Sequence, residues 1–337
     1  MNKIGLIVEG GGMKCAYSAG VLDAFLDHGL QFPYCIGVSA GSANMLSYVA
    51  GQRGRARRFY VDHIDRPGYF GVRSLLRRNG GLFGLRYIYG TLSNSDGEDP
   101  LDFAAIRANP AEAVVVATDA VTGMPAYFPK ARLRQDDYRE VMASSAIPMV
   151  CRPVRIGRRL FFDGGISDAI PIAHALDNGC DKVVVLLSKP RSYMRPPQKH
   201  RALYHRVLHR YPGAVNAIDR RHLMYNDQLH QLYTMERERR AFVFTPSRKL
   251  KMDTYAMNKE ANQQLYELGV ADAERRMEEL QAFLADGNIA GGAANAAAFG
   301  SPNGDDSETA NGAAAGRPDR AAVSTAASGE ENTDDRG

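Results

Sequence analysis

Short apolar runs recur along the chain and alternate with segments in which apolar residues stand three or four positions apart. The four clearest runs predict buried strands at residues 4–8, 36–38, 113–117 and 183–187. Shorter runs predict further strands at residues 126–128, 154–156, 160–162 and 241–244. The segments between them have the spacing of helices that bury one face. This alternation is typical of an α/β fold with a mostly parallel central sheet flanked by helices.

The C-terminal part of the chain has two different compositions. Residues 200–285 have helical spacing, and a last helix is expected at residues 255–285. From residue 286 onward the chain consists mainly of Gly, Ala, Ser, Asn and Asp, with very few large apolar residues. Such a segment cannot bury enough apolar surface to fold. We therefore expect one folded domain, residues 1–285, followed by a disordered acidic tail, residues 286–337.

Charge also separates the tail from the rest of the chain. From Asp286 on, three arginines accompany nine acidic residues, a net charge of −6, which leaves +10 on the preceding residues because the total is +4. Two basic stretches supply much of this excess. Residues 53–86 hold nine arginines and two aspartates, and residues 189–221 hold nine lysines or arginines and one aspartate. Anionic surfaces are therefore expected partners, whereas the chain has no nucleic-acid recognition motif and no nucleic acid is expected.

The first basic stretch, residues 53–86, is interleaved with aromatic residues. These are Phe59, Tyr60, Tyr69, Phe70, Phe83 and Tyr87. The mixture suits an acyl-chain site, and it also suits the headgroup level of a membrane. It equally suits an ordinary solvated helix face over a core, which is the interpretation we favour.

The N-terminus and the cysteines indicate a cytoplasmic protein. The first three residues run directly into the strand expected at residues 4–8, without the segments of a secretory signal. The longest apolar runs fall short of the roughly 20 residues that span a bilayer, so any membrane contact is expected to be peripheral. Four widely spaced cysteines are interpreted as reduced core thiols: Cys15, Cys35, Cys151 and Cys180.

The histidines do not indicate a metal site. His200, His205 and His209 have spacings that fit one helix face, but arginines surround them and no carboxylate lies among them in the sequence. We therefore predict no metal and no cofactor. The sequence gives no indication of the oligomeric state.

Residues 37–41, Gly-Val-Ser-Ala-Gly, carry the strongest single chemical signal. They follow a strand-like run and precede a segment, residues 42–50, that can form a helix. A Gly-x-Ser-x-Gly sequence at this junction forms a sharp turn that exposes the serine oxygen, so Ser39 is the candidate nucleophile. In a glycine-rich chain this pentapeptide also arises by chance, and alone it leaves a catalytic role open.

A second signal is the run Gly10, Gly11 and Gly12 between the first strand and a helix expected to begin near Lys14. Acyl transfer needs fixed donors for the negative charge that develops on the carbonyl oxygen, and bare backbone amides at a helix start supply them. The alternatives are a simple tight turn and a nucleotide-phosphate loop. The run lacks the final glycine of G-x-G-x-x-G and does not match the P-loop pattern.

A serine nucleophile also needs a proton acceptor. Several histidines follow Ser39 in the order of a catalytic triad, but their local sequence does not favour any of them. Asp163 is the better candidate, because it ends an apolar strand and two glycines, Gly164 and Gly165, follow it. The alternative for Asp163 is a type I′ hairpin turn, in which Asp-Gly is favoured for backbone reasons alone.

Together, residues 9–14, 37–41 and 163–165 resemble the three motifs of the patatin-like phospholipases, in particular the bacterial serine hydrolases of that family. The resemblance covers residues 3–190 and continues more weakly to residue 285. It implies a patatin-like three-layer fold, with the motifs in residues 3–190 and a helical part in residues 200–285.

The resemblance also implies roles for individual residues. Ser39 and Asp163 would form a catalytic dyad of nucleophile and proton acceptor, so that no histidine or metal is needed. The oxyanion hole would be formed by backbone amides of Gly10, Gly11, Gly12 and Met13. Gly37 and Gly41 would shape the turn at Ser39, and Lys14, Gly164 and Gly165 complete the motifs. Cys15 replaces a glycine that is common in the family, which puts the geometry of the loop in doubt.

The resulting hypothesis is a serine lipid acyl hydrolase of the phospholipase A, lysophospholipase or carboxylesterase type. Its substrate would be a phospholipid or another acyl-ester lipid, and the reaction would release a fatty acid. One alternative is an acyltransferase that uses the same acyl-enzyme. Another is a peripheral module that binds anionic lipid and has a vestigial site, with the basic stretches as its working surface.

Overall fold

The computed structural model describes residues 3–71, 83–248 and 257–286 of this chain. All of these residues belong to one compact unit, residues 1–293. The predicted tail lies outside the described residues, apart from Asp286. The described helices include none that is long and apolar enough to cross a membrane.

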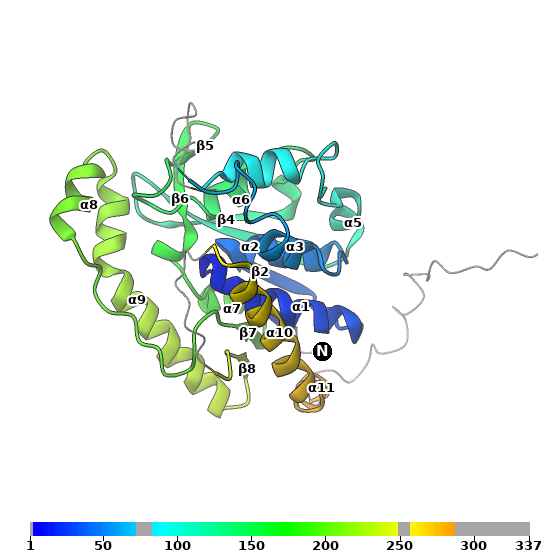
Figure 1. The fold of residues 1–337 in the computed structure, drawn as a ribbon. Helices are drawn as coiled ribbons and strands as arrows, with labels where there is room; N and C mark the ends of the chain where they lie inside the picture. The colour runs from blue at the N-terminus through cyan, green and yellow to red at the C-terminus, as the bar shows by residue number, and fades with distance from the viewer. Residues whose placement is uncertain (1–2, 72–82, 249–256, 287–337) are drawn as a thin grey trace, which may run out of the picture. The chain divides into compact units, whose positions relative to one another are not determined.

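Eight strands form the central sheet of Figure 1. They are β1 (Ile4–Val8), β2 (Tyr34–Val38), β3 (Glu112–Asp119), β4 (Pro125–Pro129), β5 (Val154–Ile156), β6 (Arg159–Asp163), β7 (Lys182–Leu186) and β8 (Ala241–Phe244). Every strand expected from the sequence is present. The order is β5-β6-β3-β2-β1-β7-β8, with β4 paired to β3. The five strands from β3 to β8 in this order are parallel, while β4, β5 and β6 pair antiparallel.

Helices and short helical turns connect the strands. The longer elements are α1 (Ala16–Asp27), α2 (Ala40–Val49), α3 (Arg55–Val61), α5 (Phe103–Ala108), α6 (Arg139–Ser144), α7 (Ile172–Asp177), α8 (Arg201–Val207), α9 (Pro212–Arg237), α10 (Lys259–Arg275) and α11 (Met277–Ala285). The short elements are η1 (Gly12–Cys15), η2 (Tyr87–Leu92), η3 (Lys130–Arg132) and η4 (Gly164–Ile166).

Each face of the sheet is covered by its own set of helices, as alternating strand side chains require. On one face, Leu6 and Val8 of β1 pack into the core formed with α1, α2 and α10. On the other face, Ile7 of β1 belongs to a second core with side chains of α7 and α9. The three-layer α/β fold with a mostly parallel sheet is therefore confirmed.

The N-terminal helix α1 and the C-terminal helix α10 cross at very close range. A Cβ atom on Gly20 of α1 would lie 2.0 Å from the carbonyl oxygen of Tyr266, and one on Gly269 of α10 would lie 2.1 Å from that of Tyr17. The two backbones can approach only because both positions lack a side chain. Polar bonds span the same contact, since Tyr266 Oη donates to Asp23 Oδ2 at 2.8 Å.

The last helix differs from the sequence prediction. Instead of one helix over residues 255–285, the structure has α10 and α11 with a break at Arg276. Residues 255 and 256 lie outside the described residues. At the break, the Arg276 guanidinium lies 4.2 Å from the ring centroid of Phe242, and its Nη1 donates to the Val243 carbonyl at 2.7 Å. These bonds to β8 account for the interruption.

Candidate active site

The ends of β2 and β6 meet because both strands pair with β3. Val38, at the end of β2, is in register with Val116, and Asp163, at the end of β6, is in register with Ala117. At Ala117 the opposite edge of β3 is occupied by β4, so β6 continues along the edge that β2 leaves. Ser39 and Asp163 are 124 positions apart in sequence, yet their side chains lie 2.6 Å apart.

Ser39 has a strained backbone at the turn between β2 and α2. Its φ of 55° and ψ of −134° are rare for a residue with a side chain, and they are typical of a nucleophile turn. The turn needs its glycines, since a Cβ on Gly41 would lie 2.4 Å from the Glu9 carbonyl oxygen and one on Gly37 would lie 2.5 Å from Ser42 Cα. The Ser39 N–H also donates to Ser144 Oγ at 2.7 Å, a contact that the sequence motifs did not predict.

Asp163 is held as a hydrogen-bond acceptor for Ser39. Ser39 Oγ donates to its Oδ2, and the Gly165 N–H donates to its Oδ1 at 2.8 Å. Burial raises the pKa of Asp163, while the guanidinium of Arg221 and the hydrogen bonds act in the opposite direction. The turn between β5 and β6 lies at Gly157, whereas Asp163 caps η4. The hairpin-turn alternative for Asp163 is therefore wrong.

The glycine loop lies directly beside the nucleophile. A Cβ on Gly10 would lie 2.7 Å from Ser39 Cβ, so the loop backbone packs against the serine itself. Gly12 has a φ of 58°, which favours glycine, and begins η1. Within the described residues, the N–H groups of residues 10–13 donate to no other protein group. These amides are therefore available to an external acceptor.

A buried ion pair lies under the same loop. Glu9, only 2% exposed, accepts from Lys189 Nζ at 3.2 Å, from Tyr225 Oη at 2.9 Å and from the Ser188 N–H at 2.7 Å. The partners of Glu9 thus lie in the segment after β7 and on α9. These bonds connect the glycine loop to the C-terminal part of the chain. A sequence signal for this ion pair existed, because Glu9 and Lys189 each follow a buried strand.

Cys15 packs beneath the loop without opening it. Its thiol is fully buried and lies 3.5 Å from the Glu9 carbonyl, to which it donates. Burial raises the pKa of Cys15, so the thiol remains protonated. The four cysteines are buried and unbonded to one another, as predicted.

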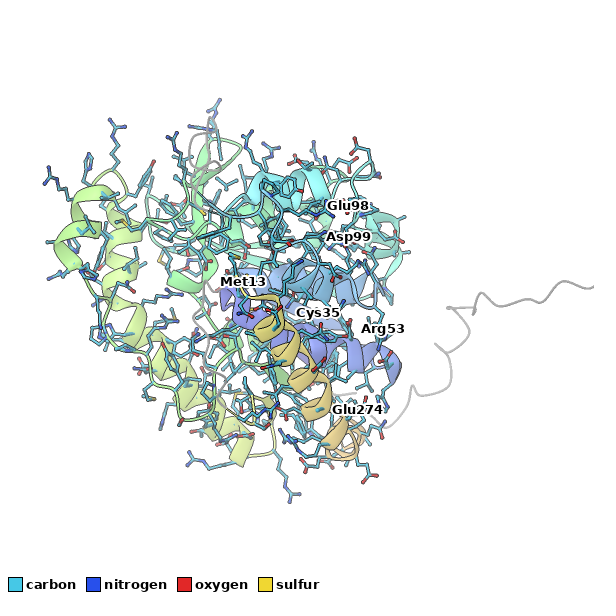
Figure 2. All side chains as sticks on the ribbon, in the orientation of Figure 1. Met13, Cys35, Arg53, Glu98, Asp99 and Glu274 are labelled. Atoms are coloured by element: carbon cyan, nitrogen blue, oxygen red, sulfur yellow. The ribbon has the colours of Figure 1, made fainter. Side chains whose placement is uncertain are left out.

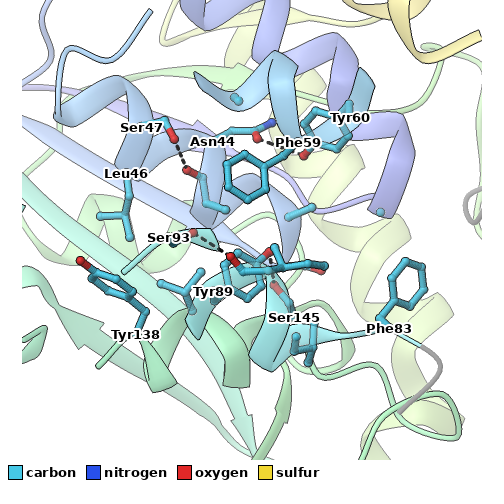
Figure 3. A pocket seen from close by; sticks show the side chains of 18 of the residues that line it. Asn44, Leu46, Ser47, Phe59, Tyr60, Phe83, Tyr89, Ser93, Tyr138 and Ser145 are labelled. Carbon is cyan, nitrogen blue, oxygen red and sulfur yellow. Dashed lines mark hydrogen bonds between the residues drawn. The ribbon is translucent and has the colours of Figure 1, made fainter. Parts of the chain in front are cut away.

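An apolar cavity, drawn in Figure 3, has Ser39 among its lining residues. Its empty space, part of which is open to solvent, amounts to about 830 Å³. Its walls come mainly from α2, α3, η2 and α6 and include Met13, Ala43, Phe59, Tyr60, Tyr69, Phe83, Ile88, Tyr89 and Val141. Figure 3 shows hydrogen bonds from Tyr60 to Asn44 and between Tyr89 and Ser145, which satisfy the polar ends of two lining rings.

The favoured interpretation of residues 53–86, a solvated helix face over a core, is confirmed for the core, because Phe59, Tyr60 and Tyr69 belong to it. Four aromatic residues of this stretch also line the cavity. Arg55 is 4% exposed, and its guanidinium donates to Ser47 Oγ and Ser93 Oγ at 3.0 and 2.9 Å. These hydroxyls and the neighbouring carboxylate of Asp99 compensate the buried charge of Arg55. The sequence shows only that Arg55 is basic and does not reveal that it is buried. Residues 72–82 of the stretch lie outside the described residues.

A second, polar cavity also has Ser39 among its lining residues. Its lining includes the glycine loop and Asp163, together with Lys189, Tyr193, Arg195, Gln198 and Arg221. Gly12, Ser39 and Ile147 line both cavities, so the nucleophile lies at their junction. The cationic residues of this wall were not predicted as site residues.

The structure brings together most of the residues that the motifs predicted. Gly165 lines the polar cavity, and Gly164 packs behind it, where a Cβ would lie 2.3 Å from the Val116 carbonyl. Lys14 also lines neither cavity, and its N–H closes the turn onto the Gly11 carbonyl at 3.3 Å. Of the described histidines, none lines either cavity; His205 instead lies 3.0 Å from Asp219 on α9.

Family models match two parts of the chain. The model of the patatin-like phospholipases matches residues 6–176, half of the chain. The chain belongs to the patatin-like phospholipase family. A second model, a domain of unknown function (DUF6363), matches residues 211–285 of this patatin-like chain and therefore includes Arg221.

Individual relatives are distant. The uncharacterized protein YjjU of Escherichia coli (strain K12) is 30% identical over 212 residues, which are 58% of the patatin-like chain and 55% of YjjU. The chain thus spans about half the length of this curated relative. Among solved structures, VipD from Legionella pneumophila has a TM-score of 0.46 at 13% identity, covering 83% of this chain and 67% of VipD. The type III effector protein ExoU has a TM-score of 0.36 at 14% identity, covering 82% and 52%.

Proposed function

We propose that this patatin-like protein is a serine hydrolase that cleaves carboxylic esters of lipids, with Ser39 as nucleophile and Asp163 as proton acceptor. The observation that carries the proposal is the 2.6 Å hydrogen bond from Ser39 Oγ to Asp163 Oδ2 at the junction of the two cavities. A serine hydroxyl becomes an effective nucleophile when a neighbouring base accepts its proton. Asp163 has the orientation that this role requires.

In the first half of the reaction, Ser39 Oγ attacks the ester carbonyl carbon while its proton passes to Asp163. The negative charge on the carbonyl oxygen is stabilised by amides of Gly10, Gly11, Gly12 and Met13, which have no other acceptor among the described residues. The carbon–oxygen bond to the alcohol then breaks, and Asp163 returns the proton to the departing alcohol oxygen. The acyl group remains as an ester on Ser39.

In the second half, a water molecule attacks the carbonyl carbon of the acyl-enzyme and transfers a proton to Asp163. The bond to Ser39 Oγ breaks, the fatty acid leaves, and the proton on Asp163 returns to Ser39. The same carboxylate thus acts as base and acid in each half, so the proposal requires no histidine.

The apolar cavity is the proposed acyl-chain site. It reaches Ser39 through Ala40, Ala43 and Met13, and its lining is predominantly aliphatic and aromatic. Burying an acyl chain there removes apolar surface from water, which stabilises the complex by about 25 cal/mol per Å². The gain grows with chain length and therefore favours long-chain esters. This lining supports a lipid rather than a small polar ester as substrate.

The test is labelling by a fluorophosphonate, which reacts covalently with activated serines, followed by mass spectrometry of the labelled peptide. We expect one label on Ser39 in the parent protein and a strongly reduced rate in Asp163→Asn. A folded parent protein that remains unlabelled, or a label on another serine, would contradict the proposal. Product analysis with an added alcohol distinguishes hydrolysis from acyl transfer.

We further propose that the enzyme contacts anionic membranes through α8. Leu203 and Val207 lie one turn apart on this helix and are 55% and 52% exposed, and the surrounding stretch is basic. Sedimentation with anionic vesicles tests this contact. Leu203→Asn should weaken binding, and unchanged binding in a Leu203→Asn, Val207→Asn double variant would exclude α8 as the contact.

A further inference from the structure

Three polar side chains on one face of α9 bind residues close to the proposed dyad and to the glycine loop. They are Arg221, Tyr225 and Gln228, which stand four and three positions apart and therefore share one face of the helix. Tyr225 is 1% exposed, and the other two are partly buried. Each of the three donates a hydrogen bond to a residue in the N-terminal part of the chain.

Arg221 holds the glycine whose N–H orients the Asp163 carboxylate. The Gly165 N–H donates to Asp163 Oδ1 at 2.8 Å, and the Gly165 carbonyl accepts from Arg221 Nε at 2.6 Å. A Cβ on Gly165 would lie 3.1 Å from Asp163 Oδ1 and 3.2 Å from Arg221 Nη2, so both groups lie close to this glycine. A hydrogen bond from a guanidinium is stronger than one between neutral groups. Arg221 thus acts on the position of Asp163 through Gly165.

Gln228 holds the segment after Asp163. Its Nε2 donates to Asp168 Oδ1 at 2.5 Å, and its Oε1 accepts from the Ile170 N–H at 3.0 Å. The other carboxylate oxygen of Asp168 accepts from Tyr127 Oη at 2.7 Å. Burial raises the pKa of Asp168, while the hydrogen bonds from Tyr127 and Gln228 act in the opposite direction. One side chain of α9 therefore satisfies both a buried carboxylate and a backbone N–H of this segment.

Tyr225 binds the residue before the glycine loop. Its Oη donates to Glu9 Oε1 at 2.9 Å, the oxygen that also accepts from Lys189 Nζ. Glu9 is followed by Gly10, where a Cβ would lie 2.7 Å from Ser39 Cβ. A shift of Glu9 would therefore move the loop relative to the nucleophile, together with the amides proposed to stabilise the oxyanion.

All three side chains connect parts of the chain that match different family models. Arg221, Tyr225 and Gln228 lie in the domain of unknown function, residues 211–285, whereas their partners lie within residues 6–176. We propose that these three are positioning residues, and that the domain of unknown function serves, through α9, to fix the loops that carry the catalytic groups. This inference rests on the proposed function, because it concerns the geometry of the reaction proposed above.

A serine–aspartate reaction tolerates little displacement of its groups. Ser39 Oγ and Asp163 Oδ2 lie 2.6 Å apart, and an error of about 1 Å in such a geometry can cost on the order of 100-fold in rate. A helix is a more rigid support than a loop. The position of α9 is itself set by apolar side chains, since Leu229, Leu232 and Met235 belong to the core on the second face of the sheet. Loss of one polar contact should therefore loosen a loop while α9 stays packed.

Two substitutions that keep most of the side-chain volume test the positioning role. Tyr225→Phe removes one hydroxyl, and Gln228→Met removes both hydrogen-bonding groups of the amide. We expect each to lower kcat for ester hydrolysis by about tenfold to a hundredfold, and to slow fluorophosphonate labelling of Ser39 by a similar factor. KM should change by less than about twofold, because neither residue lines a cavity.

The matched controls lie on the same helix. Tyr233→Phe removes a hydroxyl that donates to the Arg191 carbonyl at 3.3 Å, and Gln231→Met changes an exposed amide. Both should keep the kcat and the labelling rate of the parent. All rates are measured at a temperature at which circular dichroism shows the four variants folded, so that a loss reports on the site and not on stability.

The outcomes separate this inference from the proposed function. A folded parent that is not labelled at Ser39 would contradict the hydrolase itself. A labelled parent with Tyr225→Phe and Gln228→Met labelled equally fast would overturn only the positioning by α9. Equal losses in the two controls, or losses confined to KM, would also overturn it, because they would indicate a general effect on the helix or a role in substrate binding.

Discussion

Residues 53–66 and residues 189–221 are both rich in arginine, but the fold uses the two sets of side chains differently. In the first set every arginine has a carboxylate partner: Arg53 with Asp27, Arg55 and Arg58 with Asp99, Arg57 with Asp62, and Arg66 with Glu98. Figure 2 labels Arg53, Glu98 and Asp99 of this network. In the second set, Arg195 and Arg221 line the cavity beside the dyad.

The contrast shows what composition leaves open about a basic segment. Residues 53–66 hold five arginines and two aspartates, and residues 189–221 hold nine basic residues and one aspartate. Apart from Asp62, the acidic partners of the first set come from elsewhere in the chain, and the fold brings them into contact. Their charges are then part of the structure, and the aromatic residues between them are free to form the apolar cavity. Arg195 and Arg221 instead lie in the wall of the polar cavity, which Ser39 and Asp163 also line.

The largest effect is expected from substitution of the proposed catalytic residues, Ser39 and Asp163. Ser39→Ala and Asp163→Asn should each lower kcat/KM by on the order of 10⁴-fold or more, and the double variant should be little worse, because the dyad acts as a unit. Ester hydrolysis measured on folded protein checks this. Multiplying effects in the double variant would contradict a dyad, and so would comparable activity of Ser39→Ala and the parent.

A stability measurement sharpens the contrast between the two sets of charges. Asp99 is 4% exposed and pairs with Arg58 at 2.7 Å and His63 at 3.0 Å, so Asp99→Asn should lower the free energy of unfolding by about 3 kcal/mol. Asp219 is the matched carboxylate of the second stretch, but its partner Arg201 is 71% exposed. Asp219→Asn should cost less than about 1 kcal/mol. Urea denaturation gives both values, and equal losses would refute the contrast.

The role of the apolar cavity can be tested by filling it. Ala43 lines the cavity near Ser39, and Ala43→Phe should obstruct the entry of an acyl chain. We expect the ratio of kcat/KM for a long-chain ester to that for a butyrate ester to fall by about tenfold, since several buried methylenes are lost. A ratio equal to that of the parent would place the acyl chain elsewhere.

The pH dependence reports on the field of Arg221. Asp163 accepts a proton only when ionised, so activity falls as the pH drops through its pKa, which burial raises. Because Arg221 holds that pKa down, Arg221→Gln should move the acid limb of kcat/KM to higher pH. Rates on an uncharged monoacylglycerol exclude titration of the substrate. The control Arg66→Gln, which removes a charge of the first set, should leave the acid limb of kcat/KM unchanged. An unchanged acid limb in Arg221→Gln would contradict an effect of Arg221 on the pKa of Asp163.

The smallest expected effect concerns the acidic tail. We propose that residues 1–285 are the complete folded domain, so a chain that ends at Asp286 should keep its Tm and its activity. If the tail competes with anionic lipid for the basic stretches, this truncation should strengthen vesicle binding a few-fold at low salt. Vesicle sedimentation of the truncated and the full-length protein measures this effect. Equal binding would show that the tail does not compete with anionic lipid.

Local sequence patterns predicted the features that are determined by residues close together in the sequence. The strands β1, β5 and β8 have the predicted bounds, because apolar runs flanked by polar residues mark them directly. Ser39 and Asp163 were identified from short motifs at strand ends. Their meeting depends on the register of β2 and β6 along β3, which is set by contacts between distant segments. The break at Arg276 likewise depends on aromatic rings of β8, which helical spacing cannot reveal.

The cationic wall of the polar cavity was beyond prediction for a related reason. Arg195 and Arg221 look like other members of a basic stretch, and a sequence does not show which charges will meet carboxylates. The π-helix η2, which supplies part of the apolar cavity, also had no sequence signal. In both cases tertiary packing decides the outcome, and the local pattern is compatible with several results.

The close crossing of α1 and α10 has a consequence for how the protein is made. Synthesis proceeds from the N-terminus at about 5–20 residues per second, so the ribosome produces α10 many seconds after α1. During that interval the Gly20 face of α1 and the carboxylate of Asp23 lack the partners that Gly269 and Tyr266 later provide. The nascent N-terminal half therefore exposes a helix face that awaits its cover, and we expect it to bind chaperones until residue 275 has left the exit tunnel.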